Sequence, residues 1–183
     1  MSLVLDHLRL MARNNAYANE RLYEACCALS AAEFDAARAG FFPSISKTLN
    51  HILQVDRYYL DALTESGRGR SVFDAPALET AAELAGAQTA HDGRLTAFCD
   101  GLADRDLKRT VPQDRGGDGL WHERVDHTLL HLFQHQIHHR GQVHAMLDST
   151  SVAPPQLDEF FIRFDRHPVA EKHLANRLWE DTE

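Results

Sequence analysis

The chain has 183 residues, of which 44% are hydrophobic, and it carries a formal net charge of −8 at pH 7. This length is enough for one domain with a large core and short for two. A net negative charge without a run of Lys or Arg argues against binding to the phosphate backbone of nucleic acids, which needs a basic patch. We therefore expect no nucleic-acid partner.

The sequence also bears on the compartment. No stretch approaches the roughly 18 apolar residues that a membrane-spanning helix requires, and the opening MSLVLDHLRL lacks a basic leader with an apolar core. The three cysteines, Cys26, Cys27 and Cys99, are odd in number and two are adjacent, which is not typical of a disulfide framework. We expect a cytoplasmic protein with no membrane partner.

Four long segments have the spacing of apolar residues that is typical of amphipathic helices: residues 3–29, 44–65, 77–102 and 122–148. This pattern predicts an all-α fold, an antiparallel four-helix bundle with short terminal additions. Because no linker is long enough to divide the chain, we interpret residues 1–183 as one domain. Its core covers about residues 3–150, and residues 151–183 form a C-terminal extension.

Shorter elements are expected between and after these helices. The sequence Ser-Ala-Ala-Glu, which opens residues 30–37, has the spacing of a capping box and predicts a short helix there. The polar, glycine-rich segment 103–120 is compatible with a short β-hairpin. Two prolines follow the fourth helix, and after them we expect a helical turn at 156–163 and a last helix at 171–180.

The second predicted helix, residues 44–65, has an apolar arc wider than one face of a bundle needs. An exposed apolar surface usually marks an interface, so we expect a homodimer. Asp56 falls inside this arc and should have a partner, because a buried unpaired charge is costly. His51 lies at the edge of the arc, and periodicity alone does not place it in a site.

The fourth predicted helix contains the sequence HTLLHLFQHQIHHRGQ, which holds five of the twelve histidines. Four of them follow at i, i+4 steps and therefore lie on one face of a helix: His127, His131, His135 and His139. His138 and Gln142 fall in the same arc. Three apolar residues project from the far side: Leu130, Phe133 and Ile137.

Two imidazoles one helical turn apart can bind the same metal ion, and neutral imidazole suits Zn, Cu, Fe and Ni. The alternative is a helix whose histidines are exposed or individually hydrogen-bonded, and the residues alone leave both interpretations open. Gly141 within this helix costs roughly 1 kcal/mol relative to Ala, which suggests the close approach of another backbone or of a ligand. Arg140 projects away from the histidine face, where we expect a structural ion pair.

The segment HQIHHRGQVHAML resembles the H-x-x-x-H-R-G-Q signature of the DinB/YfiT-like metalloenzyme family. The segment SISKTLNHILQVDRYYLDAL is similar to an opening helix of that family with its T-L-N-H-I element, and PPQLDEFF is similar to family tails. These motifs occur in the family order and cover about residues 10–162.

The resemblance implies a four-helix bundle, commonly dimeric, with a metal ion held by three histidines. Carried onto this sequence, the family triad falls on His51, His135 and His139. The excess of histidines is a departure from the family pattern. It makes His131, His138 and Gln142 candidates for alternative ligands or for residues that support the ligands.

Three protein ligands leave open positions on the ion, as in catalytic sites. The resemblance implies a divalent metal (Zn, Ni or Fe), a small-molecule substrate, and an enzyme that is either a thiol-dependent S-transferase or a metal-dependent hydrolase. Family members of the first kind use mycothiol, bacillithiol or glutathione. A stress-related metal-binding protein without enzymatic activity is a further alternative. No catalytic residue is assigned, and the candidate bases are Asp56, Glu123 and Asp126.

Overall fold

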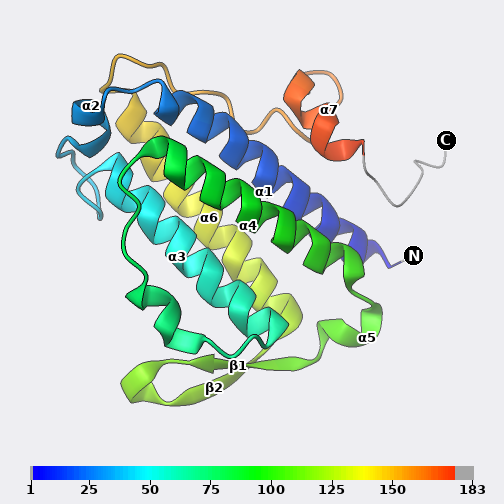
Figure 1. Ribbon diagram of the computed structural model, residues 1–183. Helices are drawn as coiled ribbons and strands as arrows, with labels where there is room; N and C mark the ends of the chain where they lie inside the picture. Colours follow the sequence, from blue (N-terminus) through cyan, green and yellow to red (C-terminus); the bar gives the residue numbers. More distant parts are fainter. Residues whose placement is uncertain (1, 176–183) are drawn as a thin grey trace.

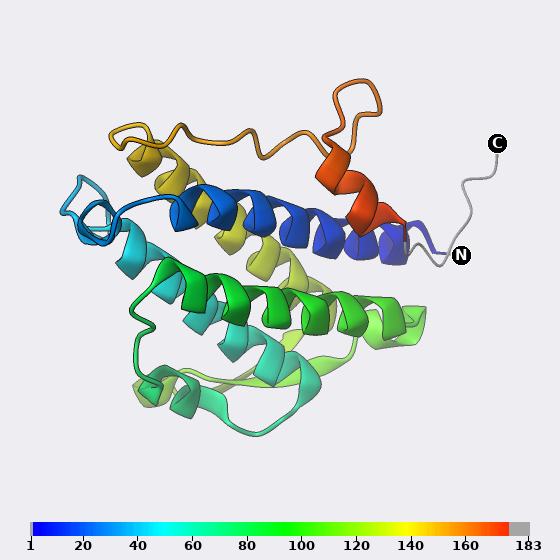
Figure 2. The ribbon, with the colours of Figure 1, turned by 45° about the horizontal axis from the view of Figure 1, so that its top comes forward.

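The computed structural model describes residues 2–175 and is built on four long helices: α1 (Leu3–Cys27), α3 (Ile45–Thr64), α4 (Ala81–Gly101) and α6 (Val125–Leu147). The predicted all-α bundle is confirmed. Figures 1 and 2 show that α1 runs antiparallel to α4, and α3 antiparallel to α6. The connection between α3 and α4 passes back along the bundle, so these two helices run in the same direction (Figure 1).

Shorter elements follow the long helices at their ends: α2 (Ala31–Asp35), η1 (Gly69–Asp74), α5 (Asp104–Leu107), β1 (Thr110–Asp114), η2 (Gly116–Asp118) and β2 (Leu120–Arg124). The last helix, α7 (Pro168–Leu174), packs along the side of α1. The capping box at α2 is present, since the hydroxyl of Ser30 accepts from the Glu33 amide and the Glu33 carboxylate accepts from the Ser30 amide. The strands β1 and β2 pair antiparallel in the predicted hairpin.

Some predicted boundaries were wrong. Residues 122–124 belong to β2 rather than to the histidine helix, because they pair with β1 and Arg124 is the extended N-cap of α6. Residues 156–163 are not helical, because Phe160 is fully buried against Tyr17, with the ring centroids 5.4 Å apart. The last helix begins at Pro168, and the predicted residues 176–180 lie outside the described residues.

Two expectations about α6 and one about α3 also change. A Cβ built at Gly141 meets no atom within 4 Å, so nothing in the described chain approaches it closely; it lies on a pocket of about 420 Å³ instead. Of the predicted apolar side of α6, Phe133 is in the core, whereas Leu130 and Ile137 are 59% and 47% exposed.

The wide apolar arc of α3 is covered within the chain by α4, α6 and β1, so the expected dimer now rests on the family resemblance alone.

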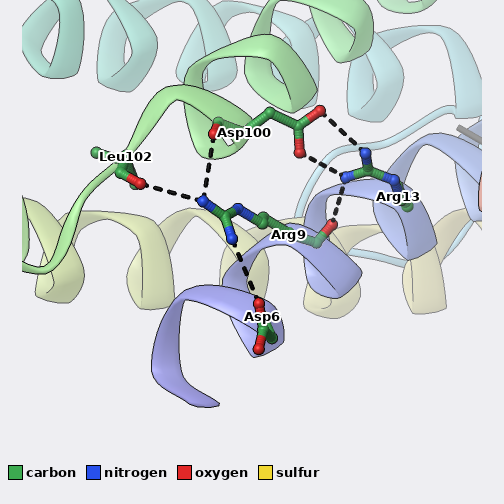
Figure 3. Close-up of polar contacts among 5 residues, drawn as sticks. All are labelled: Asp6, Arg9, Arg13, Asp100 and Leu102. Carbon is green, nitrogen blue, oxygen red and sulfur yellow. Dashed lines mark hydrogen bonds and ion pairs between the residues drawn. The ribbon is translucent and has the colours of Figure 1, made fainter. Parts of the chain in front are cut away.

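The C-terminal end of α4 is tied to α1 by two arginines (Figure 3). The guanidinium of Arg13 donates to both carboxylate oxygens of Asp100, at 2.8 and 2.9 Å. Arg9 donates to the backbone carbonyls of Asp100 and Leu102, at 3.3 and 3.2 Å. Arg9 thus satisfies carbonyls that a helix leaves without partners at its C-terminal end, and both arginines fix the α1–α4 pair.

Seven polar side chains from all four long helices form a buried layer across the bundle: Asn15, Asn19, Asp56, Gln88, Asp92, Gln136 and Arg140. We call them the polar layer. They are connected by hydrogen bonds between side chains, so the partner expected for Asp56 is present: the amides of Gln88 and Gln136 both donate to its Oδ2. A network of this kind stabilises the fold only while its members remain paired.

Arg140 occupies the centre of the polar layer. Contrary to our expectation, it forms no direct ion pair with a carboxylate of residues 2–175, because Asn15, Asn19 and Gln136 supply the oxygens that accept from its Nη1. Burial raises the pKa of Asp56 to about 8 and that of Asp92 to about 6, and it lowers the pKa of Arg140 to about 10. At neutral pH the layer therefore holds a protonated Asp56 and opposite charges on Arg140 and Asp92.

His91 on α4 is a buried base. It is 3% exposed, and neither ring nitrogen has a hydrogen-bond partner among residues 2–175. Burial, together with the charges of Arg94 and Arg57, lowers its pKa to about 3. The folded protein keeps His91 neutral at a pH where the unfolded chain, with a histidine pKa near 6.5, binds a proton. Its contribution to stability is therefore complete above about pH 6.5 and is lost progressively as the pH falls towards 3.

We expect the substitution His91→Phe to make the free energy of unfolding less sensitive to acid. The difference in slope between wild type and variant should approach about 1.4 kcal/mol per pH unit between pH 6 and 4, because one fewer proton is bound on unfolding. Urea denaturation of the metal-free proteins at several pH values measures it. His7→Phe at an exposed position is the control, and equal slopes for wild type and His91→Phe would contradict this account.

No helix within residues 2–175 is both long enough and apolar enough to cross a membrane.

Candidate metal centre

Three histidines from two antiparallel helices meet between α3 and α6. His51 lies in the second turn of α3, which begins after Ser44, whose hydroxyl accepts from the Lys47 amide. His135 and His139 lie one turn apart on α6. Each of the three offers a ring nitrogen within 4.8 Å of the others, and the Nε2 atoms of His51 and His135 are 3.1 Å apart. This arrangement could hold one metal ion.

All three imidazoles are biased towards the neutral form, which is the form that binds metals. Burial, together with the charges of neighbouring imidazoles, lowers the pKa of His51 to about 4 and that of His135 to about 3. Burial also lowers the pKa of His139, although its hydrogen bond to Gln142 opposes this effect. No proton has to be released at neutral pH before a cation can bind.

Gln142 orients His139. Its side-chain Oε1 lies 2.8 Å from His139 Nδ1, while its Nε2 lies 3.1 Å from His138 Nε2. A carbonyl oxygen can only accept, so Nδ1 of His139 carries the hydrogen and Nε2 keeps its lone pair for a metal. Supporting residues of this kind fix the tautomer and the ring orientation of metal ligands. The structure thus places Gln142 and His138 beside the three histidines, outside the group itself.

The other predicted histidines lie further along the same face of α6. The ring of His131 is 5.1 Å from that of Tyr59 and 6.4 Å from that of His135, and it does not belong to the group of three. His127 is exposed one turn earlier. The ladder therefore continues away from the three histidines as an exposed row along α6.

Phe42 is part of the site, and sequence reasoning missed it. Its ring centroid lies 4.3 Å from that of His51 and 5.8 Å from that of His139, so it covers one side of the centre. The available signal was its position in Gly-Phe-Phe-Pro, directly before Ser44 at the start of α3. An aromatic ring there excludes water and strengthens electrostatic interactions inside the site.

None of the three candidate bases belongs to the histidine group. Asp56 is 0% exposed within the polar layer. Asp126 is paired with Arg124 in the first turn of α6, with one oxygen 3.0 Å from Arg124 Nε. Glu123 lies in β2 and lines a pocket that does not include the three histidines. Within residues 2–175, the donor set at the centre is therefore imidazole alone.

These residues fit a divalent transition metal. Three imidazole nitrogens without a thiolate suit zinc, nickel or iron, and they leave at least one position for a further ligand, as in catalytic zinc sites. His135 Nδ1 is buried without a partner among the described residues, so the ring has no competing bond that would turn it out of the group. The bundle and the site together define a helical protein with a histidine-only group between two antiparallel helices that could hold a metal ion.

The chain belongs to the DinB family, whose model matches residues 1–168. Its fold is similar to that of a DinB-like protein from Bacillus subtilis, whose crystal structure aligns with a TM-score of 0.56 over 85% of this chain and 98% of that one. The two sequences are 20% identical, so the likeness concerns the fold. No curated protein matches the chain.

Proposed function

We propose that this protein is a metal-dependent enzyme that acts on a low-molecular-weight thiol as an S-transferase. One observation carries the proposal: His51, His135 and His139 form a neutral, carboxylate-free donor set with room for a further ligand. In this proposal the three imidazoles hold zinc, nickel or iron. Such an ion, when bound, favours the thiolate form of a coordinating thiol.

The thiol comes from outside the chain. Cys26 and Cys99 are buried, and burial raises the pKa of each to about 12. Cys27 is exposed, but the pKa of its thiol is also raised by partial burial, so it lacks the depressed pKa of a reactive cysteine. None of these residues is in the histidine group. A soluble thiol cofactor therefore supplies the nucleophile.

The surroundings favour thiol transfer over hydrolysis. A hydrolase commonly uses a base close to the ion to take a proton from water. The three candidate carboxylates are placed elsewhere: Asp56 in the polar layer, Asp126 in an ion pair with Arg124, and Glu123 in β2. A thiol needs no such base, because its pKa is already close to neutral pH and falls further beside a cation. Metal-dependent hydrolysis is the second candidate, and metal binding without a reaction is the third.

We expect cobalt(II)-substituted protein to develop a thiolate-to-cobalt charge-transfer band when glutathione, bacillithiol or mycothiol is added. The matched control is glutathione with a methylated sulfur, which should produce no band. Turnover with an electrophile should require the same thiol. If no thiol in the panel gives a band or turnover while esters or amides are cleaved, the protein is a hydrolase. If neither reaction occurs in fully metal-loaded protein, the enzymatic proposal fails.

A further inference from the structure

A pocket of about 550 Å³ lies between the second half of α3, η1 and the β-hairpin. Val55 and Tyr59 of α3 form its inner wall, and Phe73 and Trp121 contribute from η1 and β2. The histidine group does not line it. Its walls combine aromatic rings with charged groups of both signs, which is typical of sites for small polar molecules.

Arg115, at the tip of the hairpin, is held in place above the pocket. Its Nη2 donates to Gln113 Oε1 at 2.6 Å, and its guanidinium carbon lies 5.8 and 5.7 Å from the ring centroids of Tyr58 and Tyr59. Gln113 is 2% exposed and is itself fixed by donating to Thr128 Oγ1 at 2.9 Å. A guanidinium positioned in this way needs little ordering before it binds an anion.

The hairpin that carries Arg115 is also fixed. The hydroxyl of Tyr58 donates to the backbone carbonyl of Asp114 at 2.6 Å, which ties β1 to α3. The indole Nε1 of Trp121 donates to the backbone carbonyl of Asp118 at 3.0 Å, which holds that ring at the pocket wall. Both aromatic and cationic groups are thus arranged before a ligand arrives.

The charged groups of the pocket are only partly used within the protein. Arg115 and Arg70 form no ion pair with a carboxylate among residues 2–175. The Glu123 carboxylate has neither a hydrogen bond nor an ion pair there, although its charge attracts Arg115. Asp114 is different, because its Oδ1 accepts from the Gly116 amide. Free guanidinium groups bind carboxylates, whereas a free, half-buried carboxylate binds an ammonium.

The pocket lies further along α3 from the histidine group, and a row of side chains on α3 and α6 connects the two. Val55 lies one turn from His51 on α3, a rise of about 6 Å. Tyr59, one turn further, has its ring 5.1 Å from that of His131, which in turn lies one turn from His135 on α6. The pocket therefore lies within about two helical turns of the histidine group.

We infer that this pocket binds a zwitterionic, amino-acid-like group, with its carboxylate on Arg115 and Arg70 and its ammonium on Glu123. An anion alone would leave the carboxylates of Glu123 and Asp118, which both line the pocket, facing like charge, and a cation alone would leave Arg115 and Arg70 without a carboxylate partner. The aromatic rings of Trp121 and Phe73 pack against the rest of the ligand. A thiol built on an amino acid would bind here with its sulfur towards the histidines. This part of the inference, unlike the binding of the charged group, rests on the proposed thiol chemistry.

Three probes without a thiol test the pocket in metal-free protein: L-phenylalanine, 3-phenylpropionate and phenethylamine. They share the ring and differ in carrying both charges, only the carboxylate, or only the ammonium. The chain has two tryptophans, so Trp179→Phe leaves Trp121 as the only one, and its fluorescence reports occupancy of the pocket. L-Phenylalanine should bind at least about tenfold more tightly than either single-charge probe, as the loss of a charge-assisted hydrogen bond predicts.

Substitutions assign the two charges. Arg115→Gln should weaken the binding of L-phenylalanine and 3-phenylpropionate about tenfold and leave that of phenethylamine unchanged or stronger. Glu123→Gln should weaken the binding of L-phenylalanine and phenethylamine about tenfold and leave that of 3-phenylpropionate unchanged or stronger. Arg105→Gln, at an exposed arginine on α5, is the matched control and should change nothing. The inference is overturned if L-phenylalanine fails to bind, if either single-charge probe binds equally well, or if the control weakens binding as much as Arg115→Gln.

The comparison of the three probes needs no substitution in the pocket, so it holds whether or not the variants fold. Because metal-free protein is used, the result is independent of the cobalt experiment. Probe binding without a cobalt–thiolate band would refute the thiol chemistry and leave the pocket intact. A cobalt–thiolate band without probe binding would refute the pocket and leave the thiol chemistry intact.

Discussion

His135→Ala is expected to remove most of the bound metal from the purified protein. His51→Ala and His139→Ala should have the same effect, because each substitution leaves only two imidazole ligands where three ring nitrogens lie within 4.8 Å of one another. The loss of affinity should exceed the roughly 10- to 100-fold that removal of a supporting residue costs. Elemental analysis, followed by competition with a chelator of known affinity, measures it.

A graded series of variants makes this prediction specific. Gln142→Leu removes the acceptor that orients His139 and should cost roughly 10- to 100-fold in affinity. His144→Ala is the matched control, since His144 lies on the same helix with its Nε2 beside the backbone carbonyl of Pro155. Full occupancy in His51→Ala would show that the ion binds on α6 alone, and loss of metal in His144→Ala would show a general loss of structure.

Arg140→Met should have the largest effect on stability. It removes the only cation of the polar layer while Asp92 remains buried, and breaking a buried charge pair costs about 3–5 kcal/mol. Met has a similar length and adds no new polar atom. Urea unfolding monitored by circular dichroism gives the change in the free energy of unfolding, and Arg105→Met on the surface should change it by less than about 0.5 kcal/mol.

A double variant separates charge from packing in this prediction. Asp92→Asn removes the opposite charge, so Arg140→Met combined with Asp92→Asn should be less destabilised than the sum of the two single variants. Additive effects would mean that Arg140 acts through its volume and its bonds to Asn15, Asn19 and Gln136 rather than through its charge.

The sequence predicted the long helices to within a few residues at most ends, because their apolar spacing and their caps are local properties. It predicted the pairing of His135 with His139 for the same reason, since i and i+4 are neighbours on any helix. His51 was different. Its place depends on how α3 packs against α6, which no pattern within α3 determines, and only the family resemblance assigned it a role.

Tertiary contacts also explain the errors. Residues 122–124 pair with β1, so a hairpin replaces what would otherwise be the first turn of α6. Phe160 is buried against Tyr17, and the segment that carries it is not helical. The side-chain oxygens of Asn15, Asn19 and Gln136, rather than a carboxylate, accept from Arg140. A helical wheel does not show which side chains meet in the centre of a bundle.

The order in which the chain leaves the ribosome limits when the metal centre can form. His51 and His135 are 84 residues apart, and the ring that faces His51 belongs to the last long helix to be made. At about 5 to 20 residues per second, α3 waits on the order of 4 to 17 seconds for its partner. During that interval the nascent chain presents a single imidazole from α3, which is a poor ligand set. The three-histidine group can therefore select a metal only after translation has passed His139.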